Sequence, residues 1–159
     1  MRTVRIVRDY PHSPKKVWRV LTDPELILLW GMRPEGFSTE VGTEFRLYGV
    51  PNEKWRGFVE CRMLEAVAPR LLRYSWIGNE GQESTEVSFR LEPRGTGTRV
   101  TFVHSGFVGV KGFVFATLFM APGWKRMFRE TFPAVLGDVN DDGILRTGST
   151  LRPLFPKSA

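Results

Sequence analysis

His104 is the residue of this sequence whose type and position most directly suggest chemistry. It follows Val100 and Phe102 at alternate positions, which places it on the inward, apolar face of an expected strand. Three roles are open: a core histidine held by a neighbouring carbonyl or hydroxyl group, a hydrogen-bonding group for a ligand, and a general acid or base. Acid–base catalysis has the least support, because no carboxylate or nucleophile has a sequence position that pairs with His104.

A second candidate is the acidic stretch Asp138–Gly143, which matches the opening of a calcium-binding loop, with Leu145 at the eighth position. The twelfth position is Ser149, where that loop needs a bidentate glutamate, and no helix is expected after it. We therefore interpret the stretch as an Asx-rich turn closed by glycine. The two histidines and the single cysteine, Cys61, have no spacing that suits zinc. No metal and no cofactor is predicted.

The length and composition favour one globular domain. The chain has 159 residues, of which 42% are hydrophobic and 25% charged. The formal net charge is +6, but the basic residues are spread along expected strand faces, as at Arg56, Arg73 and Arg99, so no binding of nucleic acid is predicted. One cysteine excludes an internal disulfide framework, and the first ten residues contain no apolar signal segment. These features predict a cytoplasmic location.

The longest uncharged run is too short to cross a membrane. It extends over residues 112–124, which is 13 residues, whereas a spanning helix needs about 20. The run also contains glycine and proline. We expect its apolar part, 113–120, to be buried or to cover a pocket, and the glycines within 106–112 could let such a segment move.

Local patterns predict the elements that would position these residues. A strand is expected over 4–10, and Ser13-Pro14 and Asp23-Pro24 are start signals for two short helices, the second of which ends at Gly31. Period-two alternation then predicts antiparallel strands, each with one buried face. They are expected around residues 45–48, 55–64, 72–76, 86–91 and 99–105.

The C-terminal part is expected to be helical and then irregular. Trp124, Met127, Phe128 and Phe132 recur at helical spacing, which predicts an amphipathic helix that Pro133 should kink or shorten. Residues 146–159 have no apolar period, so we divide the chain into a domain over 1–145 and a mobile tail. Strands followed by a helix predict an α+β fold in which this helix packs across a curved sheet.

In this order, a series of short segments resembles the SRPBCC (START-like, helix-grip) superfamily, and within it the bacterial relatives of the heat-shock-protein-90 ATPase activator. The resemblance covers about residues 3–132. The segments are Ser13–Trp18, Leu21–Pro24, Trp30, Gly42–Phe45, Gly57–Val59, Pro69–Trp76, Gly97–Thr101, His104–Phe107 and Gly123–Trp124. The resemblance implies a helix-grip fold, in which a curved antiparallel sheet wraps around a long C-terminal helix and two short helices follow the first strand.

The resemblance also implies a cavity between the sheet and the last helix, whereas the pattern alone favours a filled core. We therefore expect the protein to bind a hydrophobic or aromatic small molecule, such as a lipid or a polyketide. The expected ligand-binding residues are Trp55, Val59, Tyr74, Trp76, Val87, Phe89, Phe102, His104, Trp124, Met127 and Phe128.

Two other classes of function stay open, because one fold serves many activities. The first is an interaction protein that contacts a chaperone or another client through its surface, with Phe58 and Leu64 as the apolar candidates on the outer face of the sheet. The second is a small enzyme of the cyclase or dehydratase type, which would need an ionisable cluster around His104. No catalytic residue is assigned, and the sequence favours binding over catalysis.

Overall fold

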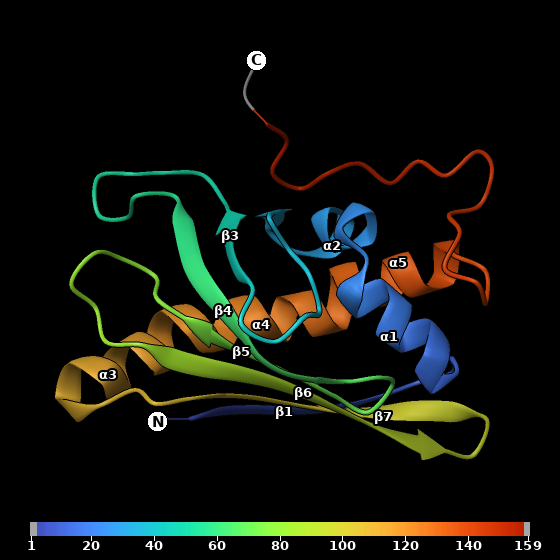
Figure 1. Ribbon diagram of the computed structural model, residues 1–159, viewed down its shortest axis with the longest axis horizontal. Helices are drawn as coiled ribbons and strands as arrows, with labels where there is room; N and C mark the ends of the chain where they lie inside the picture. Colours follow the sequence, from blue (N-terminus) through green and yellow to red (C-terminus); the bar gives the residue numbers. More distant parts are fainter. Residues whose placement is uncertain (1–2, 158–159) are drawn as a thin grey trace.

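Seven strands form one antiparallel sheet in the computed structural model, which describes residues 3–157 (Figure 1). The order across the sheet is β1-β7-β6-β5-β4-β3-β2. The strands are β1 (Val4–Tyr10), β2 (Arg33–Glu35), β3 (Glu44–Tyr48), β4 (Phe58–Val67), β5 (Leu71–Trp76), β6 (Thr85–Arg94) and β7 (Gly97–Ser105). A long C-terminal helix runs across one face, and two short helices follow β1. The expected helix-grip fold is confirmed.

The strand register explains which side chains meet on the inner face. Tyr74 of β5 is opposite Val87 of β6, and Val87 is opposite His104 of β7, so these three side chains form one row across the sheet. All three are buried, as the alternation predicts. The next row contains Leu72, Phe89 and Phe102, and these large apolar residues build the centre of the core.

Both short helices begin where the sequence predicts. The side chain of Ser13 accepts a hydrogen bond from the Lys16 amide at 3.2 Å, at the start of α1 (Pro14–Thr22). Asp23 does the same for the Glu25 amide at 2.9 Å, at the start of α2 (Pro24–Trp30). Proline at the first helical position loses no hydrogen bond, because that amide has no partner within the helix. Only Asp23 separates α2 from α1, and Gly31 is the C-cap that follows the last residue of α2.

The C-terminal helix is longer than expected and contains two π-helical segments. It extends over 30 residues as α3 (Gly109–Phe115), the π-helical η1 (Ala116–Met120), α4 (Ala121–Arg126), the π-helical η2 (Met127–Thr131) and α5 (Phe132–Asp138). Each π-helical segment ends two residues before a proline, Pro122 or Pro133. In η2 the Phe132 amide bonds the Met127 carbonyl, five residues back. We expected Pro133 to kink or shorten the helix. The helix is not shortened there: the wider turn leaves room for proline, which has no amide hydrogen, and the helix continues to Asp138.

Two other expectations about the elements hold only in part. The strand expected over 55–64 begins only at Phe58, because Gly57 has φ of +89° and breaks the extended run. The apolar segment 113–120 is helical and only partly buried, since Phe113 is 49% and Leu118 is 63% exposed, while Phe119 and Met120 at its end line a cavity. Within residues 3–157, no helix is long and apolar enough to cross a membrane.

Candidate functional site

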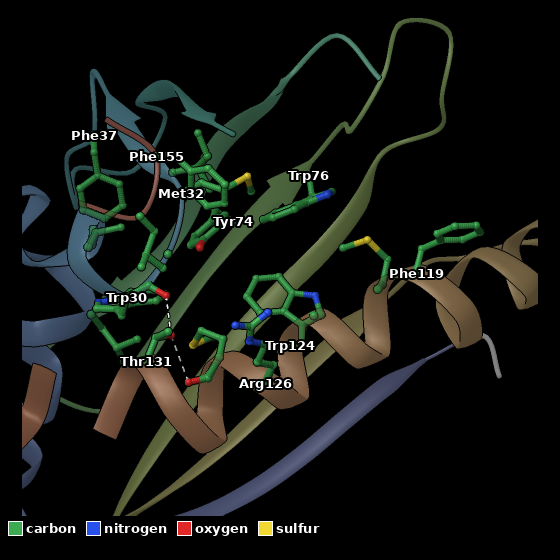
Figure 2. A pocket seen from close by; sticks show the side chains of 18 residues that line it. Trp30, Met32, Phe37, Tyr74, Trp76, Phe119, Trp124, Arg126, Thr131 and Phe155 are labelled. Carbon is green, nitrogen blue, oxygen red and sulfur yellow. Dashed lines mark hydrogen bonds between the residues drawn. The ribbon is translucent and has the colours of Figure 1, made fainter. Parts of the chain in front are cut away.

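A cavity of about 440 Å³ lies between the inner face of the sheet, helix α2 and the C-terminal helix (Figure 2). Its wall is mainly apolar and aromatic, which is typical of sites that bind small organic molecules. The lining residues are Leu21, Ile27, Trp30, Gly31, Met32, Phe37, Leu47, Tyr74, Trp76, Phe119, Met120, Gly123, Trp124, Arg126, Met127, Thr131, Leu154 and Phe155.

Helix α2 is fixed against the C-terminal helix by contacts that set the width of the cavity. The Trp30 ring meets the Phe132 ring edge to face, with centroids 5.3 Å apart. The Thr131 hydroxyl donates to the Trp30 carbonyl at 2.7 Å, and the Trp30 indole N–H donates to the Val20 carbonyl at 2.8 Å. Trp30 is therefore held at both its backbone and its ring, and its ring forms one wall of the cavity.

The opposite wall consists of two further indole rings. Trp76 lies near the end of β5, Trp124 projects from α4, and their ring centroids are 5.3 Å apart. Figure 2 shows both rings beside the cavity, with Tyr74 between them and Trp30. Three of the five tryptophans of the chain thus line one cavity, so that tryptophan emission should report on its contents.

Four of the eleven predicted ligand-binding residues line this cavity: Tyr74, Trp76, Trp124 and Met127. The other seven do not line it, and most of them belong to the packed centre of the core. Val59, Val87, Phe89, Phe102, His104 and Phe128 are at most 2% exposed.

The aromatic rings at the centre of the core contact one another directly. The centroid of Phe102 lies 5.1 Å from that of Phe89, 5.1 Å from that of Phe128 and 4.4 Å from that of Trp124. No ligand fits between these rings. The cavity lies instead beside them, toward α2.

Trp55 is placed outside the cavity by the turn before β4. Its indole N–H donates to the Gly78 carbonyl at 2.6 Å. Its ring covers Gly49 so closely that a Cβ on that residue would lie 2.8 Å from it. Trp55 thus connects two loops and does not line the cavity with Trp30, Trp76 and Trp124.

His104 is completely buried, and both of its ring nitrogens have partners. The Trp124 indole N–H donates to His104 Nδ1 at 3.1 Å, so Nδ1 is the acceptor and Nε2 carries the proton. Nε2 then donates to the Thr85 hydroxyl at 2.7 Å, and that hydroxyl donates to the Trp76 carbonyl at 3.1 Å. Burial lowers the pKa of His104 to about 3, and the ring is neutral at physiological pH.

This chain of hydrogen bonds makes His104 a positioning residue. It holds the indole of Trp124 by its nitrogen, and the face of that indole forms part of the cavity wall. The residues in contact with the imidazole, Thr85, Trp76, Phe107 and Trp124, have no acidic or basic side chain. The arrangement orients a wall of the cavity and offers no acid–base pair.

One charged side chain of the cavity wall, that of Arg126, is largely exposed to solvent, and we call this edge of the cavity its entrance. Arg126 is the single charged residue among those described that line the cavity. Its guanidinium Nε lies 2.9 Å from Glu130 Oε2, and Arg129 lies 3.6 Å from the other oxygen of the same carboxylate. Two cations share one anion here, so the entrance keeps a positive charge.

The C-terminal tail contributes to the wall of the cavity. The Leu154 amide donates to the Leu28 carbonyl of α2 at 3.1 Å, and Leu154 and Phe155 both line the cavity. Figure 1 shows the tail, in red, passing back over α2. Asp138 anchors its beginning by accepting hydrogen bonds from Arg146 at 2.7 Å and Ser149 at 2.6 Å.

The stretch after Asp138 forms the Asx turn that the sequence suggests. The Asn140 side chain accepts from the amides of Asp142 and Ile144, and Gly143 has φ of +78°. The Asp138 carboxylate, the first position of the calcium-loop pattern, is occupied by Arg146 and Ser149. Residues 3–157 contain no group of three or more His, Cys, Asp or Glu side chains that could hold a metal ion.

Sequence reasoning missed the side of the cavity formed by Trp30, Met32, Phe37, Leu154 and Phe155. The pattern identifies Trp30 as apolar, but its contact with Thr131 joins residues 101 positions apart. No local spacing signals such a pairing. The tail residues have no periodicity at all, so no sequence signal could have assigned them to the cavity.

Comparison with known proteins identifies relatives over most of the chain. Residues 11–137 match the family described as Activator of Hsp90 ATPase homolog 1-like protein. A comparison with curated proteins found no match to this chain. Among solved structures, protein MLL2253 from Mesorhizobium loti is 30% identical, with a TM-score of 0.69 over 82% of this chain and 94% of that one.

Two further solved structures have the same fold. CalU16 from Micromonospora echinospora is 26% identical, with a TM-score of 0.67 over 82% of this chain and 71% of that one. A protein from Arthrobacter aurescens is 18% identical, with a TM-score of 0.73 over 93% of this chain and 92% of that one. The architecture is therefore retained where the sequences differ greatly.

Proposed function

The chain belongs to the family of Activator of Hsp90 ATPase homolog 1-like proteins, and we propose that it binds a hydrophobic or aromatic small molecule in the cavity between sheet and C-terminal helix. The observation that carries this proposal is the cavity itself, of about 440 Å³ and walled by the rings of Trp30, Trp76 and Trp124. Cavities of this size commonly hold small organic ligands. Flat aromatic surfaces favour a ligand with rings or a compact apolar skeleton.

Gly123 provides a sharp test, because it lines the cavity and has open space above it. A Cβ on Gly123 would meet no atom within 4 Å, so the backbone there accepts a side chain, and Gly123→Phe adds a ring at the cavity. Replacing glycine by phenylalanine inside a helix also favours folding by roughly 0.3–0.5 kcal/mol, because glycine has the lower helix propensity. Ligand affinity should fall at least tenfold while the melting temperature stays the same or rises.

Gly137→Phe is the matched control. Gly137 lies in the same helix and also has no atom within 4 Å of a Cβ, but it does not line the cavity. A panel of polycyclic aromatics and fatty acids should change the tryptophan emission of the wild-type protein saturably for at least one class. The same class should act on Gly137→Phe and not on Gly123→Phe. Equal binding by both variants would contradict binding in this cavity.

A second candidate function is contact with a chaperone, and the exposed apolar face of α3 and η1 favours it. Val110 is 79% exposed and Leu118 63%, while Phe113 lies on the same helical stretch. By contrast, Phe58 on the outer sheet face is covered by the guanidinium groups of Arg46 and Arg56, at 4.4 and 4.2 Å. Exposed apolar patches commonly mark sites of protein contact.

The family description names an activator of Hsp90 ATPase, so the ATPase rate of a bacterial Hsp90 is the direct measurement for this candidate. Added protein should raise the rate, and Leu118→Glu should abolish the increase without a change in small-molecule binding, because Leu118 does not line the cavity. An unchanged ATPase rate would exclude this candidate and leave the first one intact.

A further inference from the structure

Tyr74 differs from the other tyrosines of the chain in the hydrogen bonding of its hydroxyl group. The Tyr10 hydroxyl donates to the Phe128 carbonyl at 2.6 Å, and the Tyr48 hydroxyl accepts from Arg46 at 3.5 Å. The Tyr74 hydroxyl makes no hydrogen bond to any residue that the structure describes, although the side chain is only 5% exposed. The oxygen is not one of the fully enclosed side-chain atoms that lack a partner, so it is accessible from the cavity that Tyr74 lines, where a ligand atom can bond it.

The ring of Tyr74 is fixed, and its hydroxyl is directed into the cavity. Phe45 packs edge to face against the ring at 5.2 Å, and Phe89 lies at 6.1 Å on the sheet. Figure 2 shows the oxygen pointing into the space between Trp30 and Trp124. Rigid neighbours hold the ring in place, so the hydroxyl cannot turn away to find a partner elsewhere.

The other polar side chains around this part of the cavity are either already paired or directed away from the Tyr74 hydroxyl. The indole N–H of Trp30 and that of Trp124 donate to a carbonyl and to His104, respectively. The Thr131 hydroxyl donates to the Trp30 carbonyl. The Trp76 nitrogen points away from the Tyr74 hydroxyl (Figure 2). The phenol of Tyr74 is thus the polar group that the cavity interior leaves for a ligand.

The chemistry of a buried phenol limits what it can recognise. Burial raises the pKa of Tyr74 well above its ordinary value, so the group stays neutral and keeps its proton. A neutral phenol donates one hydrogen bond, and a carbonyl oxygen can accept it. Unlike a hydroxyl group, a carbonyl group has no proton of its own that would need an acceptor in the cavity. A site with a polar group that hydrogen-bonds the ligand discriminates against analogues that lack the hydrogen-bonding atom.

Resting on the proposed binding function, we propose that the ligand carries a carbonyl oxygen on an otherwise apolar ring skeleton and that the Tyr74 hydroxyl donates a hydrogen bond to it. The carbonyl would then lie deep in the cavity, while the apolar skeleton lies against the three indole rings. Tyr74 would be the residue that distinguishes an oxygenated ligand from the corresponding hydrocarbon.

The test compares two probes that share one bicyclic skeleton, 1-tetralone and tetralin, which differ by one carbonyl oxygen. Affinities are measured by calorimetry for the wild-type protein and for Tyr74→Phe, and the ratio of the two affinities is compared between proteins. The solvation of each probe cancels in this comparison. Loss of one neutral hydrogen bond should lower the preference for tetralone about two- to tenfold.

Tyr10→Phe is the matched control, because it also removes a buried tyrosine hydroxyl. This variant breaks the bond to the Phe128 carbonyl, so it should lower the melting temperature and leave the probe ratio unchanged. Tyr74→Phe should change the ratio without lowering the melting temperature. The same ratio in the wild type and Tyr74→Phe, with both probes bound, would overturn the role of Tyr74 and leave the cavity function standing. Failure of the wild-type protein to bind either probe would instead count against both proposals.

Discussion

Lowering the pH from 7.0 to 4.5 should destabilise the folded protein by about 2–3 kcal/mol through His104 alone. The ring is completely buried, and burial lowers its pKa from 6.5 to about 3. Below pH 6.5 the unfolded chain gains a proton on this residue, whereas the folded chain stays neutral until about pH 3. The unfolded state therefore binds more protons, and stability falls as the pH falls. Each pH unit in this window costs up to about 1.4 kcal/mol.

The measurement is urea unfolding at pH 7.0, 5.5 and 4.5 at constant ionic strength, for the wild type and for His104→Leu. At pH 7.0 the variant should be less stable than the wild type, because it leaves the Trp124 indole N–H without an acceptor and removes the hydrogen bond between the imidazole and the Thr85 hydroxyl. Its loss of stability between pH 7.0 and 4.5 should nevertheless be smaller by about 2–3 kcal/mol. His12 also has a lowered pKa, caused by burial and by Lys16, but it is present in both proteins and cancels.

Equal losses of unfolding free energy in the two proteins would refute this reasoning. A second measurement addresses the residue directly, since the ring protons of His104 should keep their NMR shifts down to about pH 4. A titration midpoint near 6.5 would mean that the ring is reached by water or that the hydrogen bonds to Thr85 and Trp124 do not persist in solution.

Three further outcomes follow from individual contacts. Phe132→Ala should cost about 3–5 kcal/mol in chemical unfolding, because this completely buried ring packs against Tyr10 and Trp30; a loss below about 1 kcal/mol would contradict that packing. Arg126→Gln should weaken a fatty acid about two- to fivefold relative to the alcohol of the same chain length, and an unchanged ratio would show that the entrance charge does not act on ligands. Truncation after Leu145 removes two side chains from the cavity wall, so a bound fluorescent probe should be released faster in stopped-flow measurements; an unaltered rate would mean that the tail does not retain ligand.

The parts of the fold that depend on neighbouring residues could be predicted from the sequence. Ser13 and Asp23 cap their helices through amides two or three positions away, so the start signals are local and reliable. Strict alternation along β5, β6 and β7 likewise identifies the inward side chains. The ends of elements were less predictable where one glycine or one proline acts through backbone geometry, as at Gly57 and Pro133.

The location of the cavity could not be predicted in the same way. Alternation shows that Phe89 and Trp76 both face inward, but not how far the helix stands from the sheet at each point. The rings of Phe89, Phe102 and Phe128 fill that space at the centre, whereas toward α2 the space stays open. This difference depends on contacts such as that of Thr131 with Trp30, which join distant parts of the chain.

The occurrence of a histidine at an inward position is explained by the hydrogen bond that it accepts from Trp124. An apolar residue at position 104 would leave the Trp124 indole N–H unpaired inside the core, whereas neutral His104 accepts from it and donates to Thr85. Protonation would turn Nδ1 into a donor facing the indole donor, so the charged form loses a hydrogen bond as well as its hydration. Both effects oppose protonation, which is why the geometry and the low pKa point in the same direction. Because Trp124 forms part of the cavity wall, the group that makes folding sensitive to acid also holds the proposed ligand-binding surface in place.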